Sequence, residues 1–413
     1  MENLSRRGVL KATGGILGAL SVASIARPAR AQALATQPAW TWPSSESVAG
    51  TGDGVDPTYV WDSLADPVMA QVLAQEDVAE INTLLDTWTT NGQPLPAGLP
   101  GYLQDFMTEA SQLPSWTNQA LLTEAYSFIQ KRGLYLGLLY GLDSGMLSCA
   151  IPHEARAVYY SQGGADMRDR VTKTAKLGYD IGTQDAYQPD GSMIVTCVKT
   201  RMVHSAVRSL LPQSAGWESV TDEKIPISQR DILVTWASLP TTVMQKLVAW
   251  DLPIAANESA AYLHTWQVAA HLLGVQDEYI PASWAAANAQ AAQVLTPVLA
   301  PTMEGAYLAS ILINLGDQID DGIVTPDLIS AFTRYLLGDQ IAGWLRIPRE
   351  PLWDGLLKVA WGPFIAVREG LLPFPLAPQA YWLFDEFLRK AALLFLSDAG
   401  PISIEIPQTN RPS

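Results

Sequence analysis

A histidine flanked by two arginines stands out in a largely apolar stretch of the chain. Arg201, His204 and Arg208 lie at positions i, i+3 and i+7, so they share one face of a helix predicted over residues 192–211. An imidazole ligates haem iron, and guanidinium groups one turn away on either side bind haem propionates. The alternative is a partly exposed helix whose arginines pair with aspartate or glutamate.

A second group of basic and hydroxyl side chains lies on a helix predicted over residues 165–180. Arg170, Lys173 and Thr174 are spaced i, i+3 and i+4 and face one way. If that face points inward, burial disfavours the charged form of Lys173 and lowers its pKa. A neutral amine can bind haem iron or donate a hydrogen bond to oxygen. A solvated basic face is the alternative interpretation.

A histidine and a glutamate follow Pro152 at the start of another predicted helix. His153-Glu154 is not an H-E-x-x-H motif, because Arg156 and Ala157 follow and no second histidine comes. The motif therefore excludes a zinc peptidase. Glu154 is a candidate general base if its pocket is apolar. Otherwise it is a glutamate that complements the helix dipole.

Four histidines and two cysteines restrict the remaining metal and redox chemistry. His264 and His271 are seven residues apart, about 10.5 Å along a helix, which is too far to ligate one ion together. The chain has no C-x-x-C-H motif, so any haem is held non-covalently. Cys149 and Cys197 either form a disulfide or remain two buried thiols on separate helices.

The elements that position these residues are predicted to be helices, because the 3.6-residue period dominates and strand-like alternation is almost absent. We predict helices at residues 66–90, 98–111, 115–131, 133–149, 153–161, 165–180, 192–211, 227–238, 241–250, 256–274, 282–298, 302–315, 325–344, 351–368 and 379–398. No Gly/Ser-rich linker interrupts residues 66–400, so we expect a single large all-α domain.

The two ends of the chain have a different composition. Residues 1–31 predict a twin-arginine signal peptide: Ser5-Arg6-Arg7, an apolar stretch and an Ala29-Arg30-Ala31 cleavage site. We therefore expect export to a periplasmic or extracellular location. Residues 32–65 are rich in Pro, Gly, Ser and Thr and predict an extended N-terminal arm. Residues 401–413 contain three prolines and predict a C-terminal tail.

Composition excludes several classes of protein. With 48% hydrophobic and 16% charged residues, the chain is not intrinsically disordered. The net charge of −15 argues against a nucleic-acid partner. No stretch after the signal reaches the roughly 18 apolar residues of a membrane span. We expect a soluble mature protein, without a membrane span, that is a monomer.

Three stretches resemble the latex clearing proteins, a family of secreted rubber oxygenases: residues 153–157 (HEARA), 163–174 (GGADMRDRVTKT) and 199–208 (KTRMVHSAVR). The resemblance covers essentially the whole mature chain. It implies an all-α domain with a globin-like core that binds haem b. It also implies endo-type, dioxygen-dependent cleavage of the C=C bonds of cis-1,4-polyisoprene, giving oligo-isoprenoids with aldehyde and ketone ends.

The resemblance also assigns the proximal side of the haem. His204 matches the proximal iron ligand, and Arg201 and Arg208 match the arginines that flank it.

On the distal side, Lys173 and Thr174 match pocket residues, and Lys173 is able to reach the iron when the pocket is closed. Arg170 matches a residue that keeps this side in order, and Glu154 matches the proposed catalytic base. Two other functions fit the same residues. One is a haem oxygenase or peroxidase of the wider family acting on another lipid-like substrate, and the other is a non-catalytic exported haem or lipid carrier.

Overall fold

The structure, a computed structural model, describes residues 39–75, 77–221, 223–318, 325–371, 385, 397 and 401–412. Residues 38–413 form one compact unit. The predicted all-α fold is confirmed. The described residues contain helices and two isolated β-bridges, Ser47–Pro281 and Ser161–Asn410, but no strand. The predicted signal peptide and nearly all of the predicted helix at 379–398 lie outside the described residues.

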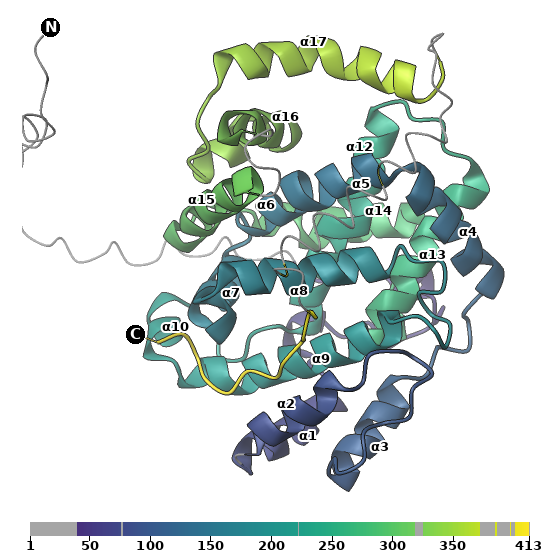
Figure 1. Ribbon diagram of the computed structural model, residues 1–413, viewed down its shortest axis with the longest axis vertical. Helices are drawn as coiled ribbons and strands as arrows, with labels where there is room; N and C mark the ends of the chain where they lie inside the picture. The colour runs from purple at the N-terminus through teal and green to yellow at the C-terminus, as the bar shows by residue number, and fades with distance from the viewer. Residues whose placement is uncertain are drawn as a thin grey trace, which may run out of the picture. The chain divides into compact units, whose positions relative to one another are not determined.

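The helices follow the predicted ranges closely (Figure 1). They are α1 (Ala65–Ala74), α2 (Val78–Asp86), α3 (Gly101–Ala110), α4 (Gln119–Lys131), α5 (Gly133–Leu138), α6 (Gly145–Ser148), α7 (Pro152–Tyr160), α8 (Met167–Asp180), α9 (Met193–Leu210), α10 (Ala215–Val220), α11 (Gln229–Trp236), α12 (Thr242–Ala249), α13 (Ala256–Leu272), α14 (Trp284–Val294), α15 (Met303–Gln318), α16 (Pro326–Trp344) and α17 (Pro351–Arg368). Two π-helical segments, Leu139–Ser144 and Ala237–Thr241, join α5 to α6 and α11 to α12.

Among the described helices, none alone has the length and apolar composition to cross a membrane. Two sharply bent helix pairs, Gly133–Ser148 with Pro152–Tyr160 and Trp284–Val298 with Met303–Leu315, meet the length and composition requirement only when taken together.

Helix α13 forms the centre of the core, because it is apolar on nearly every side and packs against α4 and α9. Two of its buried polar side chains are hydrogen-bonded to neighbouring segments. His264 Nε2 accepts from the backbone N–H of Asn118 at 2.9 Å, and Gln267 Nε2 donates to the carbonyl of Pro281 at 2.6 Å. Helix α9, 18 residues long, lies against α1, α8 and α13, so it connects the core to the predicted site.

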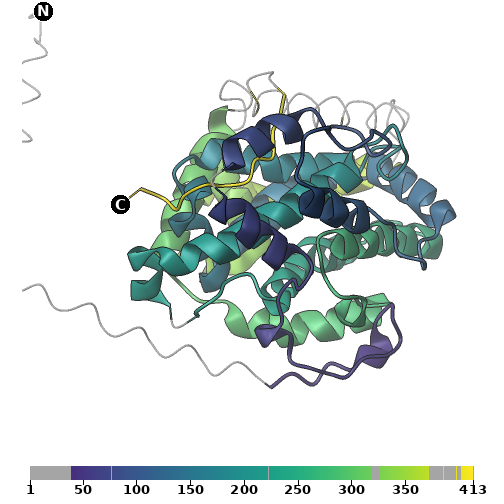
Figure 2. The same cartoon turned by 90° about the horizontal axis from the view of Figure 1, so that it is seen from below.

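The arm predicted at 32–65 is docked on the helices over its described part. It contains two short 3₁₀ turns, Ser44–Glu46 and Pro57–Tyr59, and is otherwise without regular structure until α1 begins. The indole of Trp42 donates to the carbonyl of Ala286 in α14 at 3.0 Å. Figure 2 shows the purple arm running beside this green helix.

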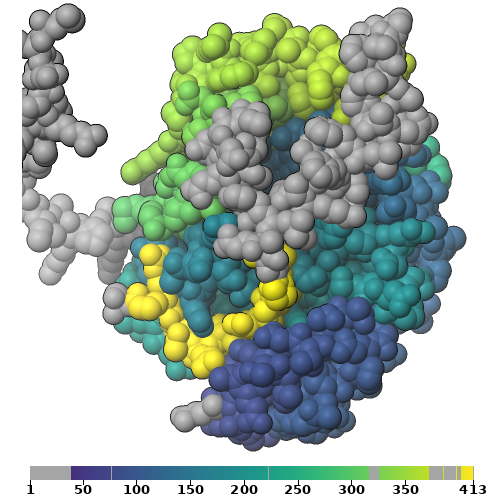
Figure 3. Space-filling view, in the orientation of Figure 1, coloured from purple at the N-terminus to yellow at the C-terminus, as the bar shows by residue number. Residues whose placement is uncertain are grey.

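Residues 401–412, predicted as a tail, form a strap across the surface (Figure 3, yellow), which we call the C-terminal strap. Ile404 and Ile406 are buried, and both backbone polar groups of Ile406 bond to the side chain of Asn82 in α2. Further along, Asn410 donates to the carbonyl of Leu210 in α9, and the guanidinium of Arg411 lies 4.1 Å from the ring centroid of Tyr159. The strap therefore fastens α2, α7 and α9.

Candidate active site

His204 lies in the middle of α9 with Nδ1 buried in the interior. Burial, together with the charges of Arg208 and Arg170, lowers its pKa to about 3, and only the charge of Asp62 opposes the shift. The imidazole is therefore neutral at pH 7, which is the form that ligates metals.

His204 also differs from the other three histidines in its partners. His153 contacts two carboxylates, His264 bonds to Asn118 and Gln267, and His271 Nδ1 lies 2.6 Å from Asp277. The Nδ1 atom of His204 has no hydrogen-bond partner within the described part of the chain. A buried polar atom without a partner calls for an explanation, and an exogenous ligand at this ring is a sufficient one.

The two arginines that flank His204 pair with carboxylates of the chain. Arg201 donates from Nε and Nη2 to the two carboxylate oxygens of Asp62 at 2.6 and 2.8 Å. Arg208 donates from Nε to Asp66 at 2.7 Å. Both guanidinium groups therefore have carboxylate partners within the chain, and their binding to haem propionates stays a prediction. The alternative, arginines paired with aspartates, describes this face of α9.

The ion pair between Asp62 and Arg201 requires a glycine at position 274. Gly274 has a φ of +93°, and a Cβ at this position would collide with the side chains of both Asp62 and Arg201. Burial raises the pKa of Asp62, but the hydrogen bonds and charge of Arg201 outweigh it, so the pKa is lowered overall. We call Asp62, Asp66, Arg201 and Arg208 the α9 ion-pair cluster.

Glu154 stands in the first turn of α7 and turns toward α11. Its Oε1 accepts a hydrogen bond of 2.6 Å from the hydroxyl of Thr235. Burial raises its pKa to about 8, with a contribution from the charge of Asp231 and against the opposing effects of Thr235 and Arg170. The carboxyl group is thus poised to exchange a proton near neutral pH.

Arg170 of α8 links Glu154 to His204. Its charge lowers the pKa of both side chains, so the guanidinium lies within electrostatic range of each of them. Burial in turn lowers the pKa of Arg170, and the charge of Glu154 opposes that shift. The structure therefore brings together three of the predicted site residues, one each from α7, α8 and α9.

Lys173 and Thr174 do not join this group. Lys173 Nζ forms an ion pair with Asp169 Oδ2 at 2.7 Å, one turn away, and Thr174 is exposed with its hydroxyl bonded to the carbonyl of Arg170. In this structure Lys173 is therefore held in an ion pair, and its approach to the iron in a closed pocket stays a prediction from the resemblance. The physical reason for this ion pair is that the ammonium group keeps its hydration and a carboxylate partner at the surface.

His153, next to Glu154 in sequence, turns toward a different set of groups. Its Nδ1 lies 3.4 Å from Asp231 Oδ1 and 3.5 Å from Glu223 Oε2. Burial lowers its pKa, but the contact with Asp231 and the charge of Glu223 outweigh burial and raise the pKa to about 9.

The two cysteines are free and buried, so of the two alternatives the structure shows two separate thiols. Burial raises the pKa of Cys149 to about 12 and shifts that of Cys197 in the same direction, so neither thiol is a ready nucleophile.

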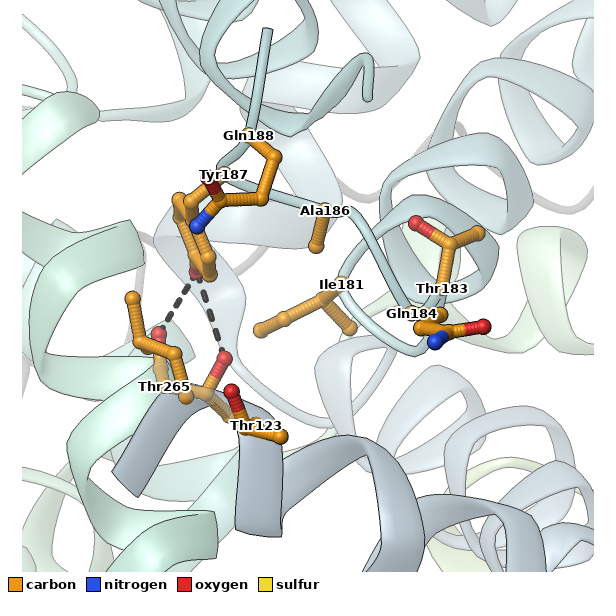
Figure 4. Close-up of a pocket in the computed structure, with 9 residues that line it drawn as sticks. Thr123, Ile181, Thr183, Gln184, Ala186, Tyr187, Gln188 and Thr265 are labelled. Carbon is orange, nitrogen blue, oxygen red and sulfur yellow. Dashed lines mark hydrogen bonds between the residues drawn. The ribbon is translucent and has the colours of Figure 1, made fainter. Parts of the chain in front are cut away.

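A small pocket lies apart from the predicted site residues, none of which lines it (Figure 4). It has a volume of about 130 Å³, and in it the hydroxyl of Tyr187 donates to the carbonyl of Thr265 at 2.7 Å. Ligand pockets are usually several times larger, about 300–1,000 Å³, so we assign no substrate to it.

Several residues of the site were not predicted from the sequence. Asp62 and Asp66 are spaced i, i+4 just where the helical pattern begins, a signal that could have marked them as partners for the α9 arginines. Thr235 and Asp231 belong to no sequence motif that would indicate a role in the site. Thr235 of α11 bonds to Glu154 of α7 across 81 residues of sequence, a contact that the local sequence pattern does not indicate.

The sequence and the structure of the chain are both similar to those of known proteins. The catalytic domain described as "ER-bound oxygenase mpaB/B'/Rubber oxygenase" matches residues 131–377, which include every predicted site residue. A curated rubber oxygenase of Streptomyces sp. (strain K30) is 53% identical over 414 residues, covering 100% of both chains. A solved structure of latex clearing protein LCP in the closed state is similar with a TM-score of 0.82 and 54% identity, covering 90% of this chain and 100% of that one. The chain therefore belongs to the mpaB/rubber oxygenase catalytic-domain family.

Proposed function

We propose that this protein is a rubber oxygenase that uses dioxygen to cleave the C=C bonds of cis-1,4-polyisoprene within the chain, giving oligo-isoprenoids with aldehyde and ketone ends. The full-length similarity to a rubber oxygenase supports the reaction class. The observation that carries the proposal at the level of residues is the grouping of Glu154, Arg170 and His204.

The cofactor that we propose is a non-covalent haem b. The residues fit such a group, because His204 offers a neutral imidazole in the interior and its Nδ1 has no partner in the described structure. His204 would hold the iron. The cofactor, when bound, supplies the activation of dioxygen.

In this proposal Glu154 is the base that takes a proton from an allylic carbon of the polymer. A buried carboxylate with a pKa of about 8 is a stronger base than an exposed glutamate, and its pKa lies near the working pH. Thr235 fixes Oε1 by its 2.6 Å hydrogen bond, which leaves Oε2 for the substrate. Arg170 limits the rise of the Glu154 pKa, so the carboxylate form remains accessible.

The test is oxygen uptake by the purified protein on polyisoprene latex, with the products separated and their end groups identified. Pyridine extraction of the same preparation identifies the haem. Oxygen uptake with carbonyl-ended oligo-isoprenoids is expected. A b-type haem without oxygen uptake would indicate a carrier, and uptake only on another lipid would indicate a different substrate. A colourless, folded protein would refute the role of His204.

We also propose that the protein is exported through the twin-arginine pathway and acts as a monomer outside the cytoplasm. The sequence pattern of residues 1–31 supports export. N-terminal sequencing of the secreted form should begin after Ala31, and gel filtration should give a mass below 44.8 kDa because the signal has been removed.

A further inference from the structure

Three side chains that the proposed reaction does not use meet beside the site. They are His153 at the start of α7, Glu223 in the loop after α10, and Asp231 in the first turn of α11. One ligand atom of each, the imidazole nitrogen and two carboxylate oxygens, lies within 4.8 Å of the other two.

The spacing of these atoms suits a metal ion better than hydrogen bonds. His153 Nδ1 lies 3.4 Å from Asp231 Oδ1 and 3.5 Å from Glu223 Oε2, whereas N–H···O bonds are mostly about 2.7–3.2 Å long. Bonds of about 2.0–2.2 Å to a tetrahedral ion place neighbouring ligand atoms roughly 3.3–3.6 Å apart. Both measured separations fall within that range.

Two of the ligands are fixed before any ion arrives. Asp231 uses Oδ2 for the capping box of α11, accepting from the backbone and hydroxyl of Ser228 at 2.8 and 2.9 Å, so Oδ1 is directed at His153. The carbonyl of Glu223 accepts a hydrogen bond from the buried indole of Trp217. Its Oε2 is buried and has no hydrogen-bond partner within the described residues.

The local charge also favours a cation. Two carboxyl groups face one imidazole. Burial and the charge of Asp231 raise the pKa of Glu223 to about 8, and a bound cation would offset both effects and favour its carboxylate form. Arg156 is close enough to affect His153, but its Nε lies 3.9 Å from Glu304. The side chain of His153 is 20% exposed, so an ion can reach it from solvent.

We propose that His153, Glu223 and Asp231 form a binding site for a first-row divalent cation of the zinc type, separate from the haem ligand His204. An imidazole with two carboxylates and an open position is a ligand set that such ions accept. The ion would tie α7 to α11, the two helices whose Glu154–Thr235 hydrogen bond orients the proposed base. This inference does not depend on the proposed reaction.

The experiment uses the full purified protein, freed of loose metal with a chelator and titrated with Zn²⁺ by calorimetry. Zinc content after gel filtration is measured in parallel. We expect one zinc per chain and a rise in Tm on zinc addition. Glu223→Gln should weaken zinc binding at least tenfold and remove the rise in Tm. The control is Glu218→Gln, an exposed glutamate of neighbouring α10, which should bind zinc as the parent does.

A second variant tests the zinc site if Glu223→Gln fails to fold. If Glu223→Gln does not fold by circular dichroism, His153→Gln takes its place and should show the same loss of zinc. Absence of saturable binding by the parent protein, or unchanged binding by a folded variant, would show that the cluster is an ion pair only and would overturn the proposal.

Discussion

The carboxyl groups of Asp62, in the α9 ion-pair cluster, and of Glu154, on the other side of the candidate site, have pKa values shifted in opposite directions. In the α9 ion-pair cluster each aspartate accepts a hydrogen bond from a guanidinium at 2.6–2.8 Å, and the pKa of the buried Asp62 is lowered. Around Glu154 the bonded partner is a neutral hydroxyl, and the pKa is raised to about 8. Paired charges hold a structure in place, whereas a buried carboxyl without a bonded cation is available for proton transfer. The following variants test this contrast.

The largest effect is expected at the residue between the two sides. His204→Ala should reduce the haem content of the purified protein to near zero, because no other histidine has an unpartnered buried nitrogen in the described structure. Pyridine haemochrome assays measure this directly. His271→Ala, which removes a histidine paired with Asp277, is the control and should retain its haem. Full haem occupancy in His204→Ala would refute the assignment.

Glu154→Gln should lower turnover on polyisoprene by about 10²–10⁴-fold, the usual contribution of a general base, with haem content unchanged. The pH profile makes the test sharper. Because the Glu154 pKa is raised to about 8, the parent enzyme should lose activity as the pH falls through 8 and the carboxylate is protonated. This limb should be absent from the residual activity of the variant. Loss of haem in the variant would instead assign Glu154 a structural role.

Asp62→Ala should destabilise the protein by about 3–5 kcal/mol, because it leaves the guanidinium of Arg201 buried without its partner. Chemical denaturation followed by circular dichroism measures the change. Arg349→Ala breaks an exposed pair with Asp339, and the expected change in stability is much smaller because solvent screens this pair. Equal effects for the two variants would mean that the α9 cluster is not structural.

The smallest effect is expected at Lys173. Replacement of Lys173 by Met removes a partly exposed pair with Asp169, so stability should change by less than about 1 kcal/mol and the haem spectrum should stay the same. A shifted Soret band in the variant would show that this lysine reaches the iron, as the resemblance to latex clearing proteins implies.

Much of the fold could be predicted because its signals are local. The 3.6-residue period gave nearly every helix, and α7 to α9 begin within two residues of their predicted starts. The break between α1 and α2 was not predicted, because residues 75–77 (QED) are polar and suit the exposed face of one continuous helix, whereas α1 ends at Ala74 and α2 begins at Val78.

The site could be predicted only in part, for two physical reasons. Helical spacing placed Arg201, His204 and Arg208 on one face, but it could not show that Asp62 from the arm would occupy Arg201. Helical spacing also placed Lys173 on the same face as Arg170. It could not show that the ammonium group of Lys173 would pair with the carboxylate of Asp169. In both cases the outcome depends on a partner that helical periodicity does not describe.

The C-terminal strap has a consequence for the order in which the molecule is made. Ile406 bonds to Asn82 across 324 residues of sequence, and Asn410 and Arg411 fasten α9 and α7. During synthesis, α7, α8 and α9 leave the ribosome long before the residues that fasten them. A stalled or prematurely terminated chain thus carries every proposed catalytic residue and still lacks the last contacts that secure the helices bearing Glu154 and His204.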